Sequence, residues 1–243
     1  MACIIDMDSN KKLKYWDRMD KFLKEKKLFC FTPEVMLATF LTEIALAIYV
    51  FIRYRLTAFG RLAGAILILL GAFQFAEYRV CADPSQLFWP RAGFAITTFL
   101  PVLGLHLISL VTKKSHFLKF GYVLMLTYVF IFLFAPKAIS GAVCGGNYII
   151  FNTAQNLAWT YSVYYFGFLL LGIWEAFENM TKANKDILIW IIVGYFSFML
   201  PMGIVYSLSI ESRQAIPSIT CGFALILAFI LAFKITPKYK QII

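Results

Sequence analysis

The sequence predicts an all-α integral membrane protein built as a single bundle of seven transmembrane helices. Of its 243 residues, 61% are hydrophobic and only 15% are charged, and the mean hydropathy is +0.75. Soluble domains are roughly 45–50% apolar and about 25% charged, and a soluble fold of this size could not hide so much apolar surface from water. The same composition excludes an intrinsically disordered chain, a coiled coil and a disulfide-rich secreted miniprotein.

Seven apolar runs provide the helices, because about 20 apolar residues in a helix cross the ~30 Å of hydrocarbon in a bilayer. The runs are continuous and lack the alternation of membrane β-barrel strands. In chain order the predicted spans are Phe31–Ile52, Leu62–Tyr78, Leu87–Thr112, Phe117–Ala135, Leu157–Phe177, Ile187–Ser209 and Ala215–Ile235. They leave no room for a second folded domain of normal size.

The boundaries of these spans follow from their flanking residues. Arg53 closes the first span, Lys113 closes the third, and Pro237 is expected to end the seventh. Gly60 and Gly64 have the GxxxG spacing that permits close helix packing at the start of the second span. The longest connection, 136–156, contains three glycines and is predicted to be irregular. We therefore expect one domain over 31–237, between a basic tail (1–30) and a short C-terminal tail (238–243).

The basic side chains predict the orientation of the bundle, because short cytoplasmic loops are enriched in Lys and Arg. Connections on the C-terminal side carry eleven such residues, namely Arg53, Arg55, Arg61, Lys113, Lys114, Lys119, Lys182, Lys185, Lys234, Lys238 and Lys240. The opposite connections carry four, namely Arg79, Arg91, Lys137 and Arg213. This count predicts a plasma membrane protein with its N-terminus outside and its C-terminus in the cytoplasm. The eight basic residues of the 1–30 tail oppose that orientation, and this tail is either an interfacial helix or solvated.

Two cysteines fall in connections on the side predicted to be outside. Cys81 follows the second span and Cys144 lies in the longest connection. An oxidising compartment would allow a disulfide between them, although cysteine is also simply a common buried residue. The sequence has no CxxC and no Cys/His spacing typical of a metal site, so we expect no metal.

Polar side chains inside the spans are the candidate site residues, because such groups are costly in hydrocarbon and usually face the bundle interior. The candidates for a polar, ligand-binding pocket are Glu43, Gln74, Glu77, Arg91, Thr98, His106, Asn156 and Tyr164. Each also has a structural explanation. Glu77 is expected to pair with Arg91, or else with Arg79. Glu43 could be protonated and bonded to backbone, and His106 could serve only as a hydrogen-bonding partner between helices.

Several chemistries have no support in the sequence. Two histidines are too few for a His-box iron site, and the motifs of nucleotide-binding loops, serine hydrolases and zinc proteases are missing. Basic residues lie in loops, so we expect contact with anionic membrane lipids and no nucleic acid partner. We expect no cofactor. The remaining partners are a small-molecule or lipid ligand and a signalling protein.

One stretch resembles a known family. Leu87–Phe94 (LFWPRAGF), followed by Leu100–Leu107 (LPVLGLHL), resembles the third span of the N-terminal seven-transmembrane sensing module of bacterial histidine kinases, where a Trp/Arg start and a P…LH pattern recur. The span 159–172 and the Ala-Ile-Pro-Ser of 215–218 are also similar. The resemblance covers about residues 31–237 and implies a ligand received on the outer side. The chain ends six residues after Pro237, so a stand-alone sensor would signal through a partner protein.

Two other functions stay open at this stage. A small integral membrane enzyme acting on a lipid or isoprenoid could use Glu43, Glu77 or His106 as acid–base groups. A transporter subunit is the other alternative, although transporters of this size often show internal repeats or a broken helix, which are not evident in the sequence.

Overall fold

The structure is a computed structural model that describes residues 32–114, 116–144, 149–208 and 216–242. Only the backbone is described at 205–208, 216–217, 221 and 240–242. The basic tail 1–30, expected to be either an interfacial helix or a solvated segment, lies outside the described residues.

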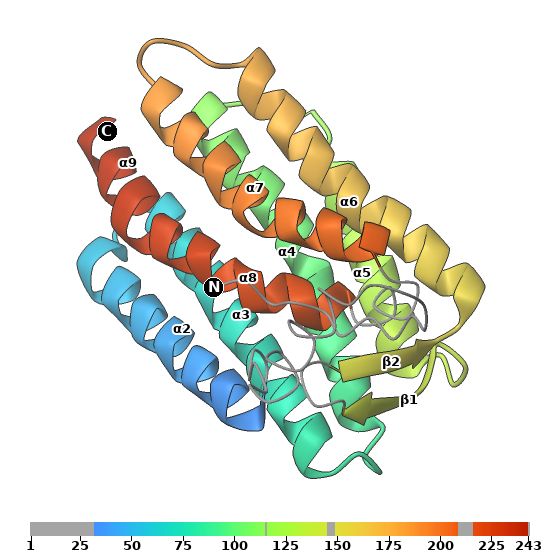
Figure 1. Ribbon diagram of the computed structural model, residues 1–243. Helices are drawn as coiled ribbons and strands as arrows, with labels where there is room; N and C mark the ends of the chain where they lie inside the picture. The colour runs from blue at the N-terminus through green and yellow to red at the C-terminus, as the bar shows by residue number, and fades with distance from the viewer. Residues whose placement is uncertain (1–31, 115, 145–148, 209–215, 243) are drawn as a thin grey trace, which may run out of the picture.

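The described chain folds into an all-α bundle of seven successive helical rods (Figure 1). Six of them are long and apolar enough to cross a membrane, and the 17-residue α5 is a shorter apolar helix. The helices are α2 (Pro33–Tyr54), α3 (Ala58–Ala82), α4 (Phe88–Thr112), α5 (Leu118–Phe134), α6 (Gln155–Glu178), α7 (Lys185–Leu208) and α8 (Ile216–Ile230), which continues through a π-helix (Leu231–Ile235) into α9 (Thr236–Ile242). The order and approximate limits of the predicted helices agree with this arrangement.

The predicted irregular connection is instead a β-hairpin, so that prediction was wrong. Strands β1 (Ile139–Cys144) and β2 (Ile149–Thr153) pair antiparallel. Ile149 and Phe151 alternate with less buried residues, which is the two-residue periodicity of a strand with one covered face. Gly141 lies at the irregularity in the strand register, so this glycine bends a strand without preventing its formation.

The seventh rod also continues further than expected. Pro237 does not end it, and the predicted C-terminal tail is helical to Ile242. The π-helix widens the turn just before the proline, and the backbone N–H and the hydroxyl of Thr236 both bond to the Leu231 carbonyl. A π turn shifts the hydrogen-bond register, which lets the helix pass a residue that has no N–H to donate.

Helices α2 and α3 approach each other closely. A Cβ added at Gly64 would come within 2.7 Å of the Phe51 ring, and one added at Gly60 would meet the Tyr54 carbonyl. The predicted close packing at the GxxxG spacing is therefore confirmed. The Thr57 hydroxyl accepts a hydrogen bond from Gly60 N and caps the start of α3.

The two ends of the bundle differ in character. At one end lie the hairpin, the α3–α4 connection and the starts of α2, α6 and α8; we call it the hairpin end (Figure 1). The opposite end carries the C-terminus and the α2–α3, α4–α5 and α6–α7 connections, and we call it the C-terminal end. Between them, large apolar side chains such as Ile52, Phe120 and Phe130 are exposed on the outside of the helices, as on a lipid-facing surface.

Candidate ligand site at the hairpin end

Helix α2 places a carboxylate in the centre of the bundle. Its buried residues Met36, Thr39, Glu43, Ala47 and Val50 are spaced three or four apart, so they form one stripe along the helix. Glu43 occupies the middle of this stripe, and its side chain is 0% exposed. The residue therefore faces the interior because its apolar neighbours on the same stripe must be buried.

Helix α3 brings two further candidates to the same region. Gln74 and Glu77 are separated by three residues and so share a face of the helix, and Glu77 is only 2% exposed. The carboxyl groups of Glu77 and Glu43 are close enough for the charge of one to act on the other. Ser218, near the start of α8, donates a hydrogen bond to the Glu77 carboxylate. We call Glu43, Gln74, Glu77 and Ser218 the carboxylate cluster.

Several polar atoms of the carboxylate cluster have no hydrogen-bond partner. They are both carboxylate oxygens of Glu43, Oε1 of Glu77 and Nε2 of Gln74. Among the described residues, no Lys or Arg nitrogen lies within 4.0 Å of either carboxylate. A buried charge without a partner is costly, and two neighbouring carboxylates oppose each other's ionisation. The cluster therefore needs a proton or a cation to be stable.

The β-hairpin is linked to the neighbouring helices at two points. Cys144, the last residue of β1, forms a disulfide with Cys81 of α3, and their Cα atoms are 5.1 Å apart. Cys81 follows Glu77 by four residues, which places it one turn further along the same side of α3. At the other strand, Ile149 N donates to the Ser218 hydroxyl over 3.4 Å. The hairpin thus links α3 to α8 beside the carboxylate cluster.

Arg91 does not form the predicted ion pair with Glu77. Its guanidinium donates to the carbonyl oxygens of Leu133 (3.5 Å) and Pro136 (2.9 Å), at the end of α5. The last carbonyls of a helix have no partner within the helix and carry partial negative charge, so a guanidinium fork satisfies them well. The alternative partner, Arg79, has its guanidinium 5.3 Å from the centre of the Trp89 ring.

Thr98 and Tyr164 lie together, and both of their hydroxyl groups bond to backbone carbonyls of helix α4. The Thr98 hydroxyl donates to the Phe94 carbonyl, and the Tyr164 hydroxyl donates to the Thr98 carbonyl over 2.7 Å. These hydrogen bonds explain the burial of both side chains without a ligand.

The last two predicted residues lie elsewhere. Nδ1 of His106 is 2.7 Å from the Tyr122 hydroxyl of α5. This histidine is therefore a hydrogen-bonding partner between two helices, which was the structural alternative to a ligand role. Asn156 is exposed in the first turn of α6 and does not line an interior pocket. The interior site is therefore narrower than the sequence predicted and centres on Glu43, Gln74 and Glu77.

Sequence reasoning missed three interior hydroxyls: Ser218 in the carboxylate cluster, and Tyr195 and Thr220, which have no hydrogen-bond partner. Each is a neutral residue in a strongly apolar span, where a hydroxyl is common. Tyr195 carried the clearest signal, because it lies in mid-span, whereas tyrosines in membrane helices concentrate at the interfaces.

The described residues contain no group of three or more His, Cys, Asp or Glu that could hold a metal ion. Comparison with protein-family models, with curated proteins and with solved structures finds no match to this chain. Any functional assignment therefore rests on the site itself.

Proposed function

We propose that this multi-pass membrane protein is a receptor-like sensor that binds a small, singly charged cation at its hairpin end. One observation carries the proposal: Glu43 of α2 and Glu77 of α3, two fully buried carboxyl groups on neighbouring helices, have no basic partner among the described residues. A bound cation would balance their charge, and the hydroxyl oxygen of Ser218 would offer a polar contact to the ligand.

The ligand would reach the carboxylate cluster from outside the cell. The Lys and Arg count favours the hairpin end as the outer side. The Cys81–Cys144 disulfide lies at that end, and disulfides persist in oxidising compartments. The resemblance to the sensing module of histidine kinases likewise implies an outer ligand. In this proposal the protein sits in the plasma membrane.

The signal would then pass along the helices to the cytoplasmic side. Glu43 and Glu77 lie on α2 and α3, whose connection is at the C-terminal end of the bundle, and Ser218 begins the rod that ends in α9. At that end Lys238 of α9 forms a 3.0 Å ion pair with Asp186 of α7. A change in how α8 packs on α3 would therefore move a surface that a signalling partner could read.

Carbodiimide labelling tests the binding step. Dicyclohexylcarbodiimide reacts with carboxyl groups in apolar surroundings, and a bound cation shields them. Full-length protein in lipid nanodiscs would be labelled in sodium, potassium or methylammonium chloride, with N-methylglucamine chloride holding ionic strength constant, and mapped by mass spectrometry. We expect labelling of Glu43 and Glu77 that at least one of the three cations suppresses. Glu178 is the control carboxyl, because it is exposed at the end of α6 and should not react.

Each outcome bears on the proposal. Labelling that changes with pH but with none of the cations would indicate a proton site and overturn cation binding. Absence of labelling at both positions would mean that the carboxyl groups are unreachable, which also overturns it. The variants Glu43→Gln and Glu77→Gln identify the labelled residue, because the peptide that contains the substitution no longer gains the mass of the carbodiimide adduct.

A second assay separates a sensor from a transporter. Proteoliposomes containing the protein should bind the protecting cation without accumulating it, whereas a transporter subunit would carry it into the lumen. The lipid enzyme alternative has no specific observation in its favour, since His106 bonds to Tyr122 and no described contact joins it to Glu43.

A further inference from the structure

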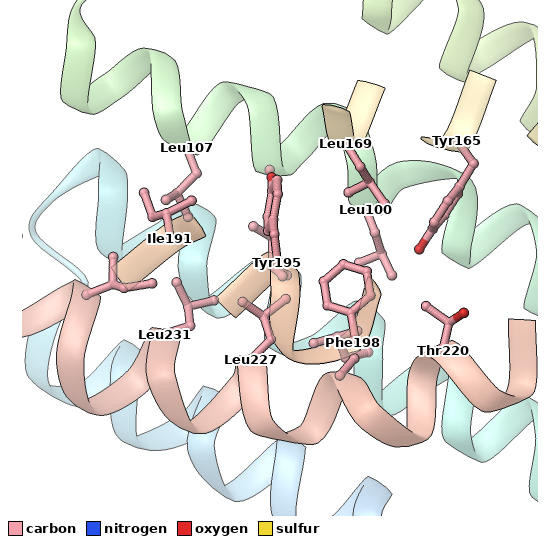
Figure 2. Close-up of a pocket in the computed structure, with 15 residues that line it drawn as sticks. Leu100, Leu107, Tyr165, Leu169, Ile191, Tyr195, Phe198, Thr220, Leu227 and Leu231 are labelled. Carbon is pink, nitrogen blue, oxygen red and sulfur yellow. The ribbon is translucent and has the colours of Figure 1, made fainter. Parts of the chain in front are cut away.

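We infer that the apolar cavity between α3, α4, α6, α7 and α8 is a second binding site, which takes a short hydrocarbon chain bearing one hydroxyl or carbonyl group. This site is independent of the carboxylate cluster. The cavity has a volume of about 50 Å³, and its walls are almost entirely aliphatic and aromatic (Figure 2). Such a lining favours a hydrocarbon occupant.

Two hydroxyl groups in this lining have no hydrogen-bond partner. They belong to Tyr195 of α7, which is 5% exposed, and to Thr220 of α8, which is 4% exposed. An unsatisfied hydroxyl in apolar surroundings is destabilising, and no bulk water reaches the centre of a membrane bundle to relieve it. An occupant with one polar group would remove part of that cost.

The backbone is shaped around one of these hydroxyls. The Tyr195 ring stands between α4 and α8, with its hydroxyl on the α4 side (Figure 2). A Cβ added at Gly104 of α4 would collide with this oxygen, and one added at Gly172 of α6 would lie 3.3 Å from the ring. Two glycines on different helices therefore leave the space that the tyrosine side chain occupies.

The irregular turn in the seventh rod lies at the same cavity. Leu231 and Ile235, the first and last residues of the π-helix, both line it. Single π turns within α-helices occur frequently at functional sites, because they reorient side chains that a regular helix would direct elsewhere. This observation is independent of the unpartnered hydroxyls.

The volume limits the size of the occupant. One water-sized group needs about 10–15 Å³ on this measure, so the cavity accepts roughly four heavy atoms. Four waters would need two to four polar partners each, and the lining offers only two unpartnered hydroxyls. A three- or four-atom hydrocarbon end with one polar group fits both the space and its chemistry better than water does.

Photolabelling with 3-azibutanol, a four-carbon alcohol that carries a diazirine, tests the inference, because its oxygen and first three carbons are the roughly four heavy atoms that the cavity accepts. Full-length protein in nanodiscs would be irradiated over a range of label concentrations, digested and mapped by mass spectrometry. We expect saturable labelling of cavity residues on α7 and α8 that excess 1-propanol, which has four heavy atoms, prevents. Ala224→Leu should abolish it, because Ala224 lines the cavity and a larger side chain fills the space.

The hydroxyls are tested by variants that keep the shape of the cavity. Tyr195→Phe and Thr220→Val each remove one hydroxyl, and at least one of them should weaken labelling about fivefold, the effect of one lost hydrogen bond. Thr160→Val is the matched control, since the Thr160 hydroxyl is exposed and bonds to its own helix. Non-saturable labelling, or unchanged labelling in Ala224→Leu, would overturn the site. Unchanged affinity in both hydroxyl variants would overturn its polar specificity.

Discussion

Replacing Gly104 by alanine should destabilise the bundle mainly through a single atom, the Tyr195 hydroxyl. The new Cβ would collide with that oxygen, whereas the next nearest atom, the ring carbon that bears it, is 3.2 Å away. Tyr195 is almost fully buried, so its ring cannot move aside without disturbing its neighbours. The conflict therefore lies mainly with the hydroxyl oxygen, and the ring carbon adds a smaller one.

The expected size of the effect comes from two opposing contributions. Overpacking a filled interior costs about 1–3 kcal/mol, and glycine to alanine within a helix returns about 0.5–1 kcal/mol. The free energy of unfolding should therefore fall by about 1–2 kcal/mol. In a Tyr195→Phe background the colliding oxygen is gone, so the same substitution should cost less than in the wild type. The coupling between the two sites should be about 1–2 kcal/mol.

Unfolding of the purified full-length chain in detergent micelles, titrated with dodecyl sulfate and followed by circular dichroism, measures these differences. Gly167→Ala is the control, because a Cβ added at Gly167 meets no atom within 4 Å. It should be neutral or slightly stabilising. If Gly104→Ala were as stable as Gly167→Ala, or lost equal stability with and without the tyrosine hydroxyl, the described packing would be wrong.

Three further predictions concern the hairpin end. Arg91→Gln should lower the free energy of unfolding by about 2 kcal/mol, because it removes the hydrogen bonds to the carbonyls at the end of α5. The effects of Arg91→Gln and Glu77→Gln should add to within about 0.5 kcal/mol, since the two side chains are not paired, and a larger coupling in the double-mutant cycle would show that the ion pair exists. Reducing the Cys81–Cys144 disulfide, which joins residues 63 positions apart, should lower the free energy of unfolding by up to about 4 kcal/mol. Unfolding titrations with and without reductant measure the difference, and an unchanged midpoint would contradict the prediction. Hydrogen bonds from the following turn hold the pKa of the Asp83 carboxyl below its usual value, so the ionised carboxylate stabilises the α3–α4 connection at a pH above the usual pKa. That contribution is lost as the pH falls through the lowered pKa. Amide hydrogen exchange in the connection should rise in that pH range, and Asp83→Asn should abolish the pH dependence.

The helices could be predicted from the sequence because length and hydropathy fix them almost alone in a bilayer. The second helix nevertheless begins at Ala58, four residues before the predicted Leu62, because the Thr57 cap starts it outside the apolar run. The hairpin could not be predicted from its glycines. The hairpin is bonded to Cys81 and Ser218, which are both distant from it in the sequence and reach it only in the folded bundle.

The candidate site could be predicted only in part, since the cost of burial identifies which polar residues face inward but not what they contact. Gln74 and Glu77 are three residues apart in one helix, and their proximity is visible in the sequence. The predicted pairing of Glu77 with Arg91 failed because the carbonyls at the end of α5, which are far from Arg91 in the sequence, compete for its guanidinium. The tertiary arrangement decides which partner wins.

The state of the hydrogen bonds separates structural from functional polar groups in this bundle. Thr98, His106 and Tyr164 are each satisfied by a neighbouring helix or by their own, so their burial is explained without any ligand. Glu43 and Tyr195 are buried and have side-chain oxygens without a hydrogen-bond partner. In hydrocarbon no bulk water relieves such a group, so an unpartnered atom there implies an occupant more strongly than it would in a soluble core. Because the two groups differ in chemistry, one a carboxylate and the other a hydroxyl in an apolar cavity, they call for different occupants. Suppression of carbodiimide labelling by a cation should therefore be unaffected by Ala224→Leu, and saturable alcohol labelling should survive Glu43→Gln.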